Sequence, residues 1–488
     1  MSPVEVLSVA SEAFPLVKTG GLADVVGALP AALAPHDVRV RTLLPGYPAV
    51  RDQLHEVREV ARLPHGFGGA ATLLEATDGG LDLLVLDAPH LYARAGGPYA
   101  DAQGRDWPDN LARFAALARV AADIGRGLVP DWRPDIVHAH DWQAGLAPAY
   151  LSYGEGYRRP GTVITVHNLA FQGTFPAETF PTLGLPPEAF GLHGVEYYGQ
   201  VGLLKAGLAL ADRVTTVSPT YAAEIRTAAH GMGLDGLLRE RAAVLSGILN
   251  GIDTTIWDPR TDPHIAAPYD PKGIAPRRRN TAALQGRLGL TIAPETPVLG
   301  MVSRLTWQKG IDLLLAALPA IERLGAQLVV VGTGDAEFER ALQAAAATHP
   351  GRIAVHLGYD EALAHQVQAG VDALLVPSRF EPCGLTQLCA LRYGAIPVVA
   401  RVGGLADTVV DANPMALATG AGTGIVFTPD SVDDLVLAIE RTLRLRRDGR
   451  TWLAMQRRAM ATPVGWETPA RHYADLYRAL HADTGRWR

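Results

Sequence analysis

At 488 residues, the chain is long enough for two or three domains with substantial cores, and its 48% hydrophobic and 19% charged residues are typical of a soluble globular protein. The net charge of −6 excludes a basic surface for nucleic acid, and two cysteines, Cys383 and Cys389, are too few for a disulfide framework or a zinc-ligand set. The chain starts without a signal-peptide pattern, and no apolar run approaches the roughly 20 residues of a membrane span. We therefore expect a cytoplasmic protein with neither membrane nor nucleic-acid partners.

The first half of the sequence alternates predicted strands and helices. Residues 4–10 form an apolar run typical of a buried strand, and a Gly-Gly turn leads from it into a predicted helix. Near-continuous apolar strands in a βαβα order indicate a parallel sheet with helices on both faces. Further strands are predicted at residues 38–44, 135–141, 162–166 and 212–218, with a hairpin formed by 70–75 and 81–87 and helices at 111–127 and 194–211.

A Pro-, Asp- and Arg-rich stretch at residues 257–279 separates the two halves, after which the alternation restarts. From Trp466 onward, apolar residues at helical spacing predict a helix with one buried face. We predict an α/β protein with an N-terminal domain over residues 1–247, a C-terminal domain over 248–465, and a helix over 466–488 that returns to the first domain. The strands predicted in the second domain are residues 298–302, 327–331, 353–356, 373–377 and 396–400.

Lysine is scarce in this chain. Of 44 basic residues, only Lys18, Lys205, Lys272 and Lys309 are lysines. Because arginine serves elsewhere, each retained lysine is a candidate for a role that needs a compact ammonium on a flexible stem. Lys272 lies in the Pro-rich stretch, and chance is the better explanation there.

A glycine-rich corner occurs twice. Residues 18–24 read Lys-Thr-Gly-Gly-Leu-Ala-Asp, and residues 401–407 read Arg-Val-Gly-Gly-Leu-Ala-Asp, each between a strand and a helix. Glycines allow a close approach of the backbone, and the N–H groups of the following helix suit an anion. We include Lys18, Gly20 and Gly21 in the predicted site, but only symmetry supports the second copy.

Polar residues cluster where strands end, which is where open α/β sheets bind ligands. Arg304 and Lys309 follow one strand and are able to grip a diphosphate from two directions, although an exposed basic turn is an equal alternative. Glu381 follows another strand in a Pro- and Gly-containing turn, either to meet sugar hydroxyls or simply to stabilise a helix N-terminus. Cys383 is more often a small buried thiol than a nucleophile.

Two other patterns bear on metals and nucleotides. His138 and His140 alternate on a strand, but no third histidine or cysteine stands at ligand spacing, so a zinc site is not expected. His167 is a candidate general base or a satisfied histidine at a strand end. The sequence has Gly332 and Gly334 after a strand but neither a complete dinucleotide fingerprint nor a P-loop, which weakens a dehydrogenase or an NTPase.

Together these segments resemble the ADP-glucose-dependent bacterial glycogen synthases and plant starch synthases. The matching segments, in order and at similar spacing over nearly the whole chain, are residues 18–24, 138–142, 165–173, 212–218, 250–253, 303–310 and 380–386. The resemblance implies a GT-B architecture, with two Rossmann-like domains facing across a deep cleft. It also implies retaining transfer of glucose from ADP-glucose to the non-reducing end of an α-1,4-glucan such as glycogen. No metal or pyridoxal phosphate is expected.

The resemblance also implies roles for residues at the matching positions. Arg304 and Lys309 would neutralise the leaving diphosphate, and Lys18 would meet it from the opposite domain. His167 would bring its backbone carbonyl near the reacting carbon. The residues expected to line the donor and acceptor sites are Gly20, Gly21, Tyr99, Asp141, Asn168, Asn250, Glu381, Cys383, Gly384, Leu385 and Thr386.

Three alternatives share this scaffold. A glucan phosphorylase needs a lysine for pyridoxal phosphate, and only Lys272 and Lys309 are available in the second half. A non-catalytic glucan-binding protein predicts loss of Arg304, Lys309 or Glu381, yet all three are present. A sugar-nucleotide epimerase would act without glucan. For retention itself we prefer same-face attack to double displacement, because no second carboxylate is evident beside Glu381.

Overall fold

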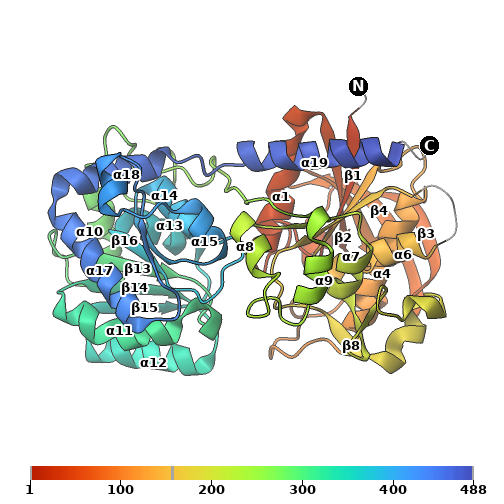
Figure 1. Ribbon diagram of the computed structural model, residues 1–488, viewed down its shortest axis with the longest axis horizontal. Helices are drawn as coiled ribbons and strands as arrows, with labels where there is room; N and C mark the ends of the chain where they lie inside the picture. The colour runs from red at the N-terminus through yellow and green to blue at the C-terminus, as the bar shows by residue number, and fades with distance from the viewer. Residues whose placement is uncertain (1–2, 155–158, 486–488) are drawn as a thin grey trace. The chain divides into compact units, whose positions relative to one another are not determined.

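The computed structural model of the protein describes residues 3–154 and 159–485. Its contacts divide the chain into two compact units (Figure 1). The first unit consists of Met1–Asn250 with Trp466–Arg488, and the second of Gly251–Gly465. Each unit is an α/β fold with a sheet of its own.

In the first unit, the strand order of the main sheet is β12-β11-β7-β6-β1-β2-β5-β4-β3. From β12 to β5 the neighbours are parallel, and β4 and β3 extend the sheet as antiparallel strands. The central strands β1 and β7 are almost entirely buried, as expected of a sheet covered on both faces. Their bounds are β1 Val4–Val9, β2 Val38–Pro45, β3 Arg58–Gly66, β4 Gly69–Asp78, β5 Leu81–Asp87, β6 Ile136–His140, β7 Gly161–Val166, β11 Arg213–Thr216 and β12 Leu245–Gly247.

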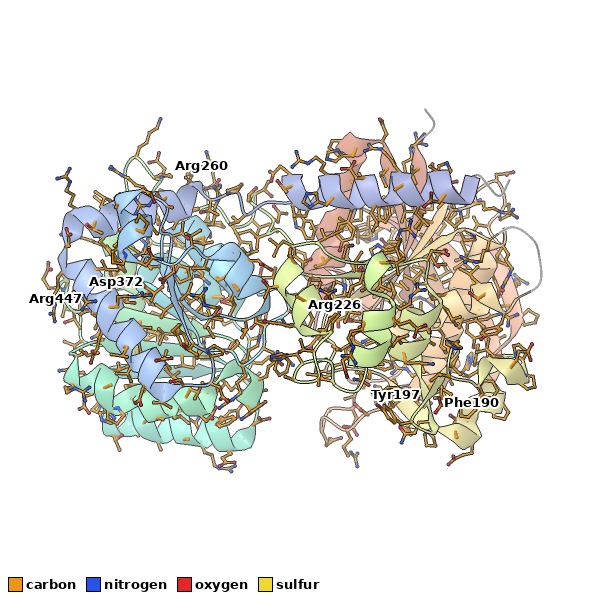
Figure 2. The ribbon with its side chains drawn as sticks, viewed as in Figure 1. Phe190, Tyr197, Arg226, Arg260, Asp372 and Arg447 are labelled. Atoms are coloured by element: carbon orange, nitrogen blue, oxygen red, sulfur yellow. The ribbon has the colours of Figure 1, made fainter. Side chains whose placement is uncertain are left out.

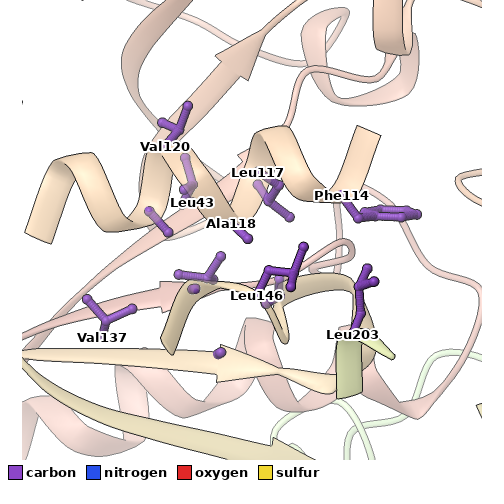
Figure 3. Close-up of a cluster of buried hydrophobic side chains, with 14 of the residues drawn as sticks. Leu43, Phe114, Leu117, Ala118, Val120, Val137, Leu146 and Leu203 are labelled. Atoms are coloured by element: carbon purple, nitrogen blue, oxygen red, sulfur yellow. The ribbon is translucent and has the colours of Figure 1, made fainter. Parts of the chain in front are cut away.

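Helix α4 (Asn110–Gly125) covers one face of this sheet. Its apolar side chains, including Phe114, Leu117 and Ala118, are buried in one cluster with Leu43 and Val137 from the strands (Figure 3). Truncating a fully buried leucine such as Leu117 to alanine typically costs about 2–5 kcal/mol. The other helices of the unit are α1 Gly21–Leu33, α2 Pro48–Arg51, α3 Pro89–Tyr92, α5 Asp141–Ala144, α6 Ala147–Ser152, α7 Leu203–Leu210, α8 Pro219–Glu224 and α9 Asp235–Glu240.

The C-terminal helix α19 (Glu467–Gly485) packs on the first unit, against α1 and the strands β1 and β7 (Figure 1). Tyr473, Tyr477 and Leu480 are buried in one cluster with residues of those elements, as their helical spacing predicts. An ion pair between Arg213 and Asp483, 2.7 Å apart, adds a polar contact at the edge of this helix. Residues 486–488 of the predicted helix lie outside the described residues.

The second unit has an all-parallel sheet in the order β15-β14-β13-β16-β17-β18. Its strands are β13 Val298–Val302, β14 Gln327–Gly332, β15 Ile353–Leu357, β16 Ala373–Val376, β17 Ile396–Ala400 and β18 Ile425–Phe427. Its helices are α10 Arg277–Arg287, α11 Ile311–Arg323, α12 Ala336–Thr348, α13 Glu361–Gly370, α14 Thr386–Tyr393, α15 Gly403–Thr408, α16 Pro414–Ala418, α17 Val432–Arg447 and α18 Gly449–Ala461. The predicted strands of both halves are confirmed, while β3, β12 and β18 of the two main sheets were not predicted.

One predicted helix is wrong over half of its length. Residues 194–202 contain the short strands β9 (Glu196–Tyr197) and β10 (Gln200–Gly202), and α7 starts only at Leu203. Strand β10 pairs with β9 on one side and with β8 (Thr174–Pro176) on the other. The reason is a tight turn, because Tyr198 and Gly199 both have positive φ angles, 48° and 76°, which no helix contains. Tyr197 of this hairpin (Figure 2) donates its hydroxyl to the Met232 carbonyl at 3.1 Å.

Candidate active site

The predicted Lys18 loop is held in place by the carboxylate of Glu12, which no sequence motif singles out. Glu12 is buried three residues after the end of β1, and it accepts hydrogen bonds from the Thr19 hydroxyl at 2.6 Å and from the Thr19 and Gly20 N–H groups. These two N–H groups therefore face Glu12 and not an outside anion. The N–H groups that begin α1 at Gly21 are the donors that a helix start leaves for a ligand.

The Lys18 ammonium lies at the rim of this loop. Its Nζ is 2.7 Å from Oδ1 of Asp24 and 5.4 Å from the centre of the Phe14 ring. Both charged side chains are about 30% exposed (29% and 31%), so the pair is accessible to solvent and adds little stability. A diphosphate that approaches the loop would compete with Asp24 for the ammonium.

Tyr99 reaches the same carboxylate from the long segment between β5 and α4. Its hydroxyl bonds to Glu12 and to Oγ of Ser11, the latter at 2.8 Å. Burial and the neighbouring Glu12 raise the pKa of Tyr99 well above its ordinary value. The segment is ordered by the buried guanidinium of Arg113, which donates to the carbonyls of Leu91 and Pro98 at 3.0 and 2.8 Å. Tyr99 therefore helps to hold the Lys18 loop through Glu12.

Asp141 begins α5 directly after β6. Its φ angle of 55° is in the left-handed region, which costs a non-glycine residue about 1–3 kcal/mol and is typical of functional sites. This conformation turns Oδ1 toward the backbone N–H of His167, which donates at 2.7 Å. Burial raises the pKa of Asp141 to about 7, although backbone hydrogen bonds from His167 and Asn168 work against that rise. These three predicted site residues are thus in direct contact.

Three histidines line up behind Asp141. Nδ1 of His140 lies 3.0 Å from Nε2 of His167, and the His140 ring stacks on His138 with 4.1 Å between the ring centres. His138 in turn bonds to the Tyr477 hydroxyl of α19 at 2.7 Å and to Oγ1 of Thr165 at 2.6 Å. Burial lowers the pKa of His138 and of His167 to about 3 and that of His140 well below its ordinary value, so all three rings are neutral.

The three histidines His138, His140 and His167 could be taken for metal ligands, although the sequence predicts no zinc site. The third histidine is supplied by the end of β7, a position that spacing along the sequence does not reveal. Its ring is used in a hydrogen bond to His140. Over the described ranges of the chain, no group of three or more His, Cys, Asp or Glu side chains is arranged to hold a metal ion.

In the second unit, Lys309 and Glu381 form an ion pair. Nζ of Lys309 is 2.5 Å from Oε2 of Glu381, which also accepts from the Ser378 hydroxyl at 2.9 Å. The two residues follow β13 and β16, which are neighbours in the sheet, so the strand ends bring them together. Gly310 has a φ of 70°, and a Cβ there would lie 2.2 Å from the Pro377 carbonyl oxygen, so only glycine allows the two loops to pack this closely.

Arg304 has a different environment from Lys309. It is exposed at the end of β13, with Nη2 3.5 Å from Oε1 of Gln308. The other arginine of this region, Arg379, is fully used within the unit, since it forms a bidentate pair with Asp312 at 2.7 Å and stacks on Trp307 at 4.3 Å. Arg304 is therefore the more exposed of the two guanidinium groups, and Arg379 fixes the loop around it.

The second copy of the glycine-rich corner supports the Glu381 turn. A Cβ on Gly403 would lie 2.0 Å from the Glu381 carbonyl oxygen, and one on Gly404 would lie 2.2 Å from that of Cys383. The Gly404 N–H also donates to the Glu381 carbonyl at 3.1 Å. The two glycines are thus explained by close packing against residues 381–383. By contrast, a Cβ on Gly20 in the first copy would meet nothing within 4 Å.

The turn that contains Glu381 leads into α14, which begins at Thr386. Gly384 has a φ of 72°, and Gln387 donates its amide to the carbonyls of Cys383 and Gly384 at 3.0 and 2.9 Å. Cys383 is buried and is not part of a disulfide, and Leu385 packs against the second core. Oγ1 of Thr386 is buried and has no hydrogen-bond partner among the described residues. The start of α14 therefore presents N–H groups and a hydroxyl at the same strand ends as Lys309.

Lys205, the remaining candidate lysine, has a structural role. Its ammonium donates to three backbone carbonyls, those of Gly191, Leu192 and Gly194, the last at 2.8 Å. Three carbonyls converging on one point suit an ammonium better than a planar guanidinium. Asn250 is the last residue of the N-terminal segment of the first unit, where the chain passes into the second unit.

Two α/β units with parallel sheets, each carrying a glycine-rich turn and a lysine at its strand ends, define the GT-B class of glycosyltransferases. The comparisons agree. Residues 5–240 match the family model described as the starch synthase catalytic domain, and residues 288–458 match glycosyl transferases group 1. The chain therefore belongs to the glycogen and starch synthase family, as its sequence motifs predict, and it is a glycosyltransferase.

Individual relatives are similar to this chain over nearly its whole length. A glycogen synthase of Rhodopseudomonas palustris (strain BisB18) is 60% identical over 482 residues, which cover 99% of this chain and 98% of that protein. A glycogen synthase of Granulibacter bethesdensis is 58% identical over 478 residues, covering 98% and 99%. The catalytic domain of starch synthase IV from Arabidopsis thaliana, solved with ADP and acarbose bound, superposes with a TM-score of 0.90 at 31% identity and covers 99% of this chain and 100% of its own.

A more distant structure shares only the fold. Sucrose-phosphate synthase from Thermosynechococcus elongatus has a TM-score of 0.60 at 19% identity and covers 99% of this chain and 100% of its own. Within the part of the chain that the structure describes, no helix is long and apolar enough to cross a membrane.

Proposed function

We propose that the protein is a glycogen synthase that transfers glucose from ADP-glucose to the non-reducing end of an α-1,4-glucan with retention of configuration. The observation that carries this proposal is the 60% identity, over 99% of the chain, to a protein named glycogen synthase. The choice of adenine is supported by the starch synthase IV structure, which was solved with ADP bound. A cytoplasmic location follows from the substrates and from the composition.

In the donor half of the proposed mechanism, Arg304 and Lys309 take up the charge of the departing diphosphate. Preorganised cations at the leaving oxygens lower the barrier without a metal or pyridoxal phosphate. In the resting protein Glu381 neutralises Lys309 at 2.5 Å. The N–H groups at the start of α14, with Gly384, Leu385 and Thr386, support the phosphates. Lys18 and the start of α1 at Gly21 serve the same ligand from the N-terminal domain.

In the acceptor half, Asp141, His167 and Asn168 hold the sugars. The hydrogen bond from the His167 N–H to Asp141 fixes the backbone there, so that the His167 carbonyl has a defined position for the reacting carbon. Tyr99 acts indirectly, because it helps to hold the Lys18 loop. Asn250 acts at the point where the chain passes from the first domain to the second.

The bond between the donor C1 and the diphosphate oxygen breaks with both electrons leaving on the diphosphate, and the glucan 4-hydroxyl oxygen forms the new bond on the same face. The hydroxyl proton goes to the departing diphosphate oxygen, so no base on the protein is consumed. Glu381 is already bonded to Lys309 and Ser378, which suits an orienting carboxylate better than a nucleophile. Trapping with a fluorinated donor that labels Glu381 or Asp141 covalently would contradict same-face attack.

The direct test is glucose incorporation into glycogen from ADP-glucose and from UDP-glucose in parallel. We expect faster incorporation from ADP-glucose and none when glycogen is omitted. Conversion of the sugar nucleotide without glucan would point to an epimerase instead. Equal rates from both donors would leave the transfer reaction in place but contradict the preference for adenine.

A further inference from the structure

His140 stands between the buried His138 and the half-buried His167, and it uses one ring nitrogen only. Its Nδ1 lies 3.0 Å from Nε2 of His167. Its Nε2 is buried and has no hydrogen-bond partner among the described residues, and the side chain as a whole is 0% exposed. The single proton of this bond therefore decides how both rings are protonated.

Two arrangements satisfy the distance. If His167 donated from Nε2, neutral His140 would carry its own proton on Nε2, where a buried N–H would face no acceptor. If His140 donates from Nδ1, its Nε2 is a bare lone pair. Buried N–H groups without an acceptor are rarer than acceptors without a donor, so the second arrangement is favoured. His167 then accepts on Nε2 and carries its proton on Nδ1.

We propose that His140 is a positioning residue that holds His167 in the Nδ1–H tautomer, so that His167 presents a donor to an oxygen of the bound sugar or phosphate. Nδ1 of His167 makes no hydrogen bond with a described residue and is not among the buried unpartnered atoms. The identity of the ligand rests on the proposed function, but the tautomer does not.

The neighbours of His140 explain why its ring stays in this orientation. His138 stacks on it at 4.1 Å with the ring planes 35° apart. The His138 ring is itself fixed at both nitrogens, by the Tyr477 hydroxyl at 2.7 Å and by Oγ1 of Thr165 at 2.6 Å. Through Tyr477, the C-terminal helix α19 supports a row of rings that ends at His167.

The test is a 15N spectrum of the full-length protein with labelled histidine and without substrate, which distinguishes protonated from bare ring nitrogens. We expect His140 and His167 both to be protonated on Nδ1 and bare on Nε2. A wild-type His167 protonated on Nε2 would overturn the proposal, and this measurement stands even if a variant does not fold.

Two substitutions distinguish the effect of the His140 hydrogen bond from the effect of its packing. His140→Leu removes the Nδ1–H, whereas His140→Asn places an amide N–H near the same position. Losing one hydrogen bond to His167 should lower kcat about tenfold in His140→Leu with little change in KM for glycogen, and should give His167 a mixture of tautomers. His140→Asn should restore most of kcat and the single tautomer. An unchanged His167 spectrum in His140→Leu would contradict the proposal.

The readouts also separate this proposal from the proposed function. If wild-type protein shows the expected tautomers but transfers no glucose to glycogen, the proposed function fails and the role of His140 stands. If transfer is present and His167 is protonated on Nε2, the proposed function stands and the role of His140 fails.

Discussion

The ammonium of Lys309 lies 2.5 Å from the carboxylate of Glu381, so the lysine at the end of β13 and the acid at the end of β16 neutralise each other in the resting protein. A diphosphate that binds Lys309 must replace or share this carboxylate. The pair therefore keeps the lysine oriented at the strand ends before substrate arrives. The positive charge of the lysine becomes available to the diphosphate only when the ligand displaces or shares Glu381.

Lys18→Ala should weaken use of ADP-glucose and leave binding of glycogen unchanged. The ammonium has Asp24 as its charged partner at 2.7 Å on a partly exposed loop, so its loss leaves no buried charge behind. Loss of one charge-assisted contact with the diphosphate should raise KM for ADP-glucose about tenfold. Steady-state kinetics with each substrate varied measures this effect. Lys272→Ala, an exposed lysine in the Pro-rich stretch, is the matched control and should behave as wild type.

Glu12→Ala should destabilise the protein and disorder the Lys18 loop. It leaves the N–H groups of Thr19 and Gly20 and the Tyr99 hydroxyl without their shared acceptor. We expect a loss of roughly 2–4 kcal/mol in the free energy of unfolding, measured by urea denaturation. Tyr99→Phe removes one of these bonds and should cost about 1 kcal/mol. A Tyr99→Phe variant as unstable as Glu12→Ala would contradict the role of Glu12 as an acceptor shared by the loop and Tyr99.

Asp141 should give the protein a specific pH dependence. Its pKa is about 7 in the folded state against an ordinary value of 3.8, so between these values the folded state binds the extra proton and stability falls as pH rises. Full ionisation of this buried group costs up to about 4 kcal/mol. His138 and His167, with folded pKa values of about 3 against 6.5, change stability in the opposite direction over pH 3–6.5.

Because these effects oppose each other, the difference between wild type and Asp141→Asn isolates the aspartate. Asp141→Asn should gain stability relative to wild type as pH rises from 5 to 7.5, measured by thermal unfolding at each pH. A constant difference over that interval would show that Asp141 is ionised throughout.

Gly404→Ala should distort the Glu381 turn, while Gly20→Ala in the first glycine-rich copy should have little effect. A Cβ at Gly404 would lie 2.2 Å from the Cys383 carbonyl oxygen, but one at Gly20 would meet nothing within 4 Å. We expect Gly404→Ala to lower the melting temperature by several degrees, for a loss of about 1–3 kcal/mol, and to reduce glucose transfer. Gly20→Ala should leave the melting temperature nearly unchanged. Equal effects on stability would contradict the packing role of Gly404.

The sequence predicted the sheets well because buried parallel strands are continuous apolar runs, as in β7 (Gly161–Val166). It failed at residues 194–202, where the turn depends on the left-handed conformation of Tyr198, a residue type that gives no such signal. The site residues at strand ends were predictable because parallel strands end at one edge, which brings Lys309 and Glu381 together.

The supporting residues were not predictable in the same way. Glu12 has no motif of its own, and its partner Tyr99 is 87 residues away. In the sequence, His140 stands out only as a candidate metal ligand, since its contact with His167 joins two different strands. Its position before Asp141 at a strand end was the available signal.

We propose that Lys309 takes up the negative charge of the leaving diphosphate during glucosyl transfer. The most direct test is incorporation of glucose from ADP-glucose into glycogen by wild type and by Lys309→Ala, with Lys272→Ala, at an exposed lysine of the Pro-rich stretch, as the control. Removing a preorganised cation from the leaving group should lower kcat by about 10²–10³-fold while the variant still binds glycogen. Incorporation by Lys309→Ala at the wild-type rate would contradict the account.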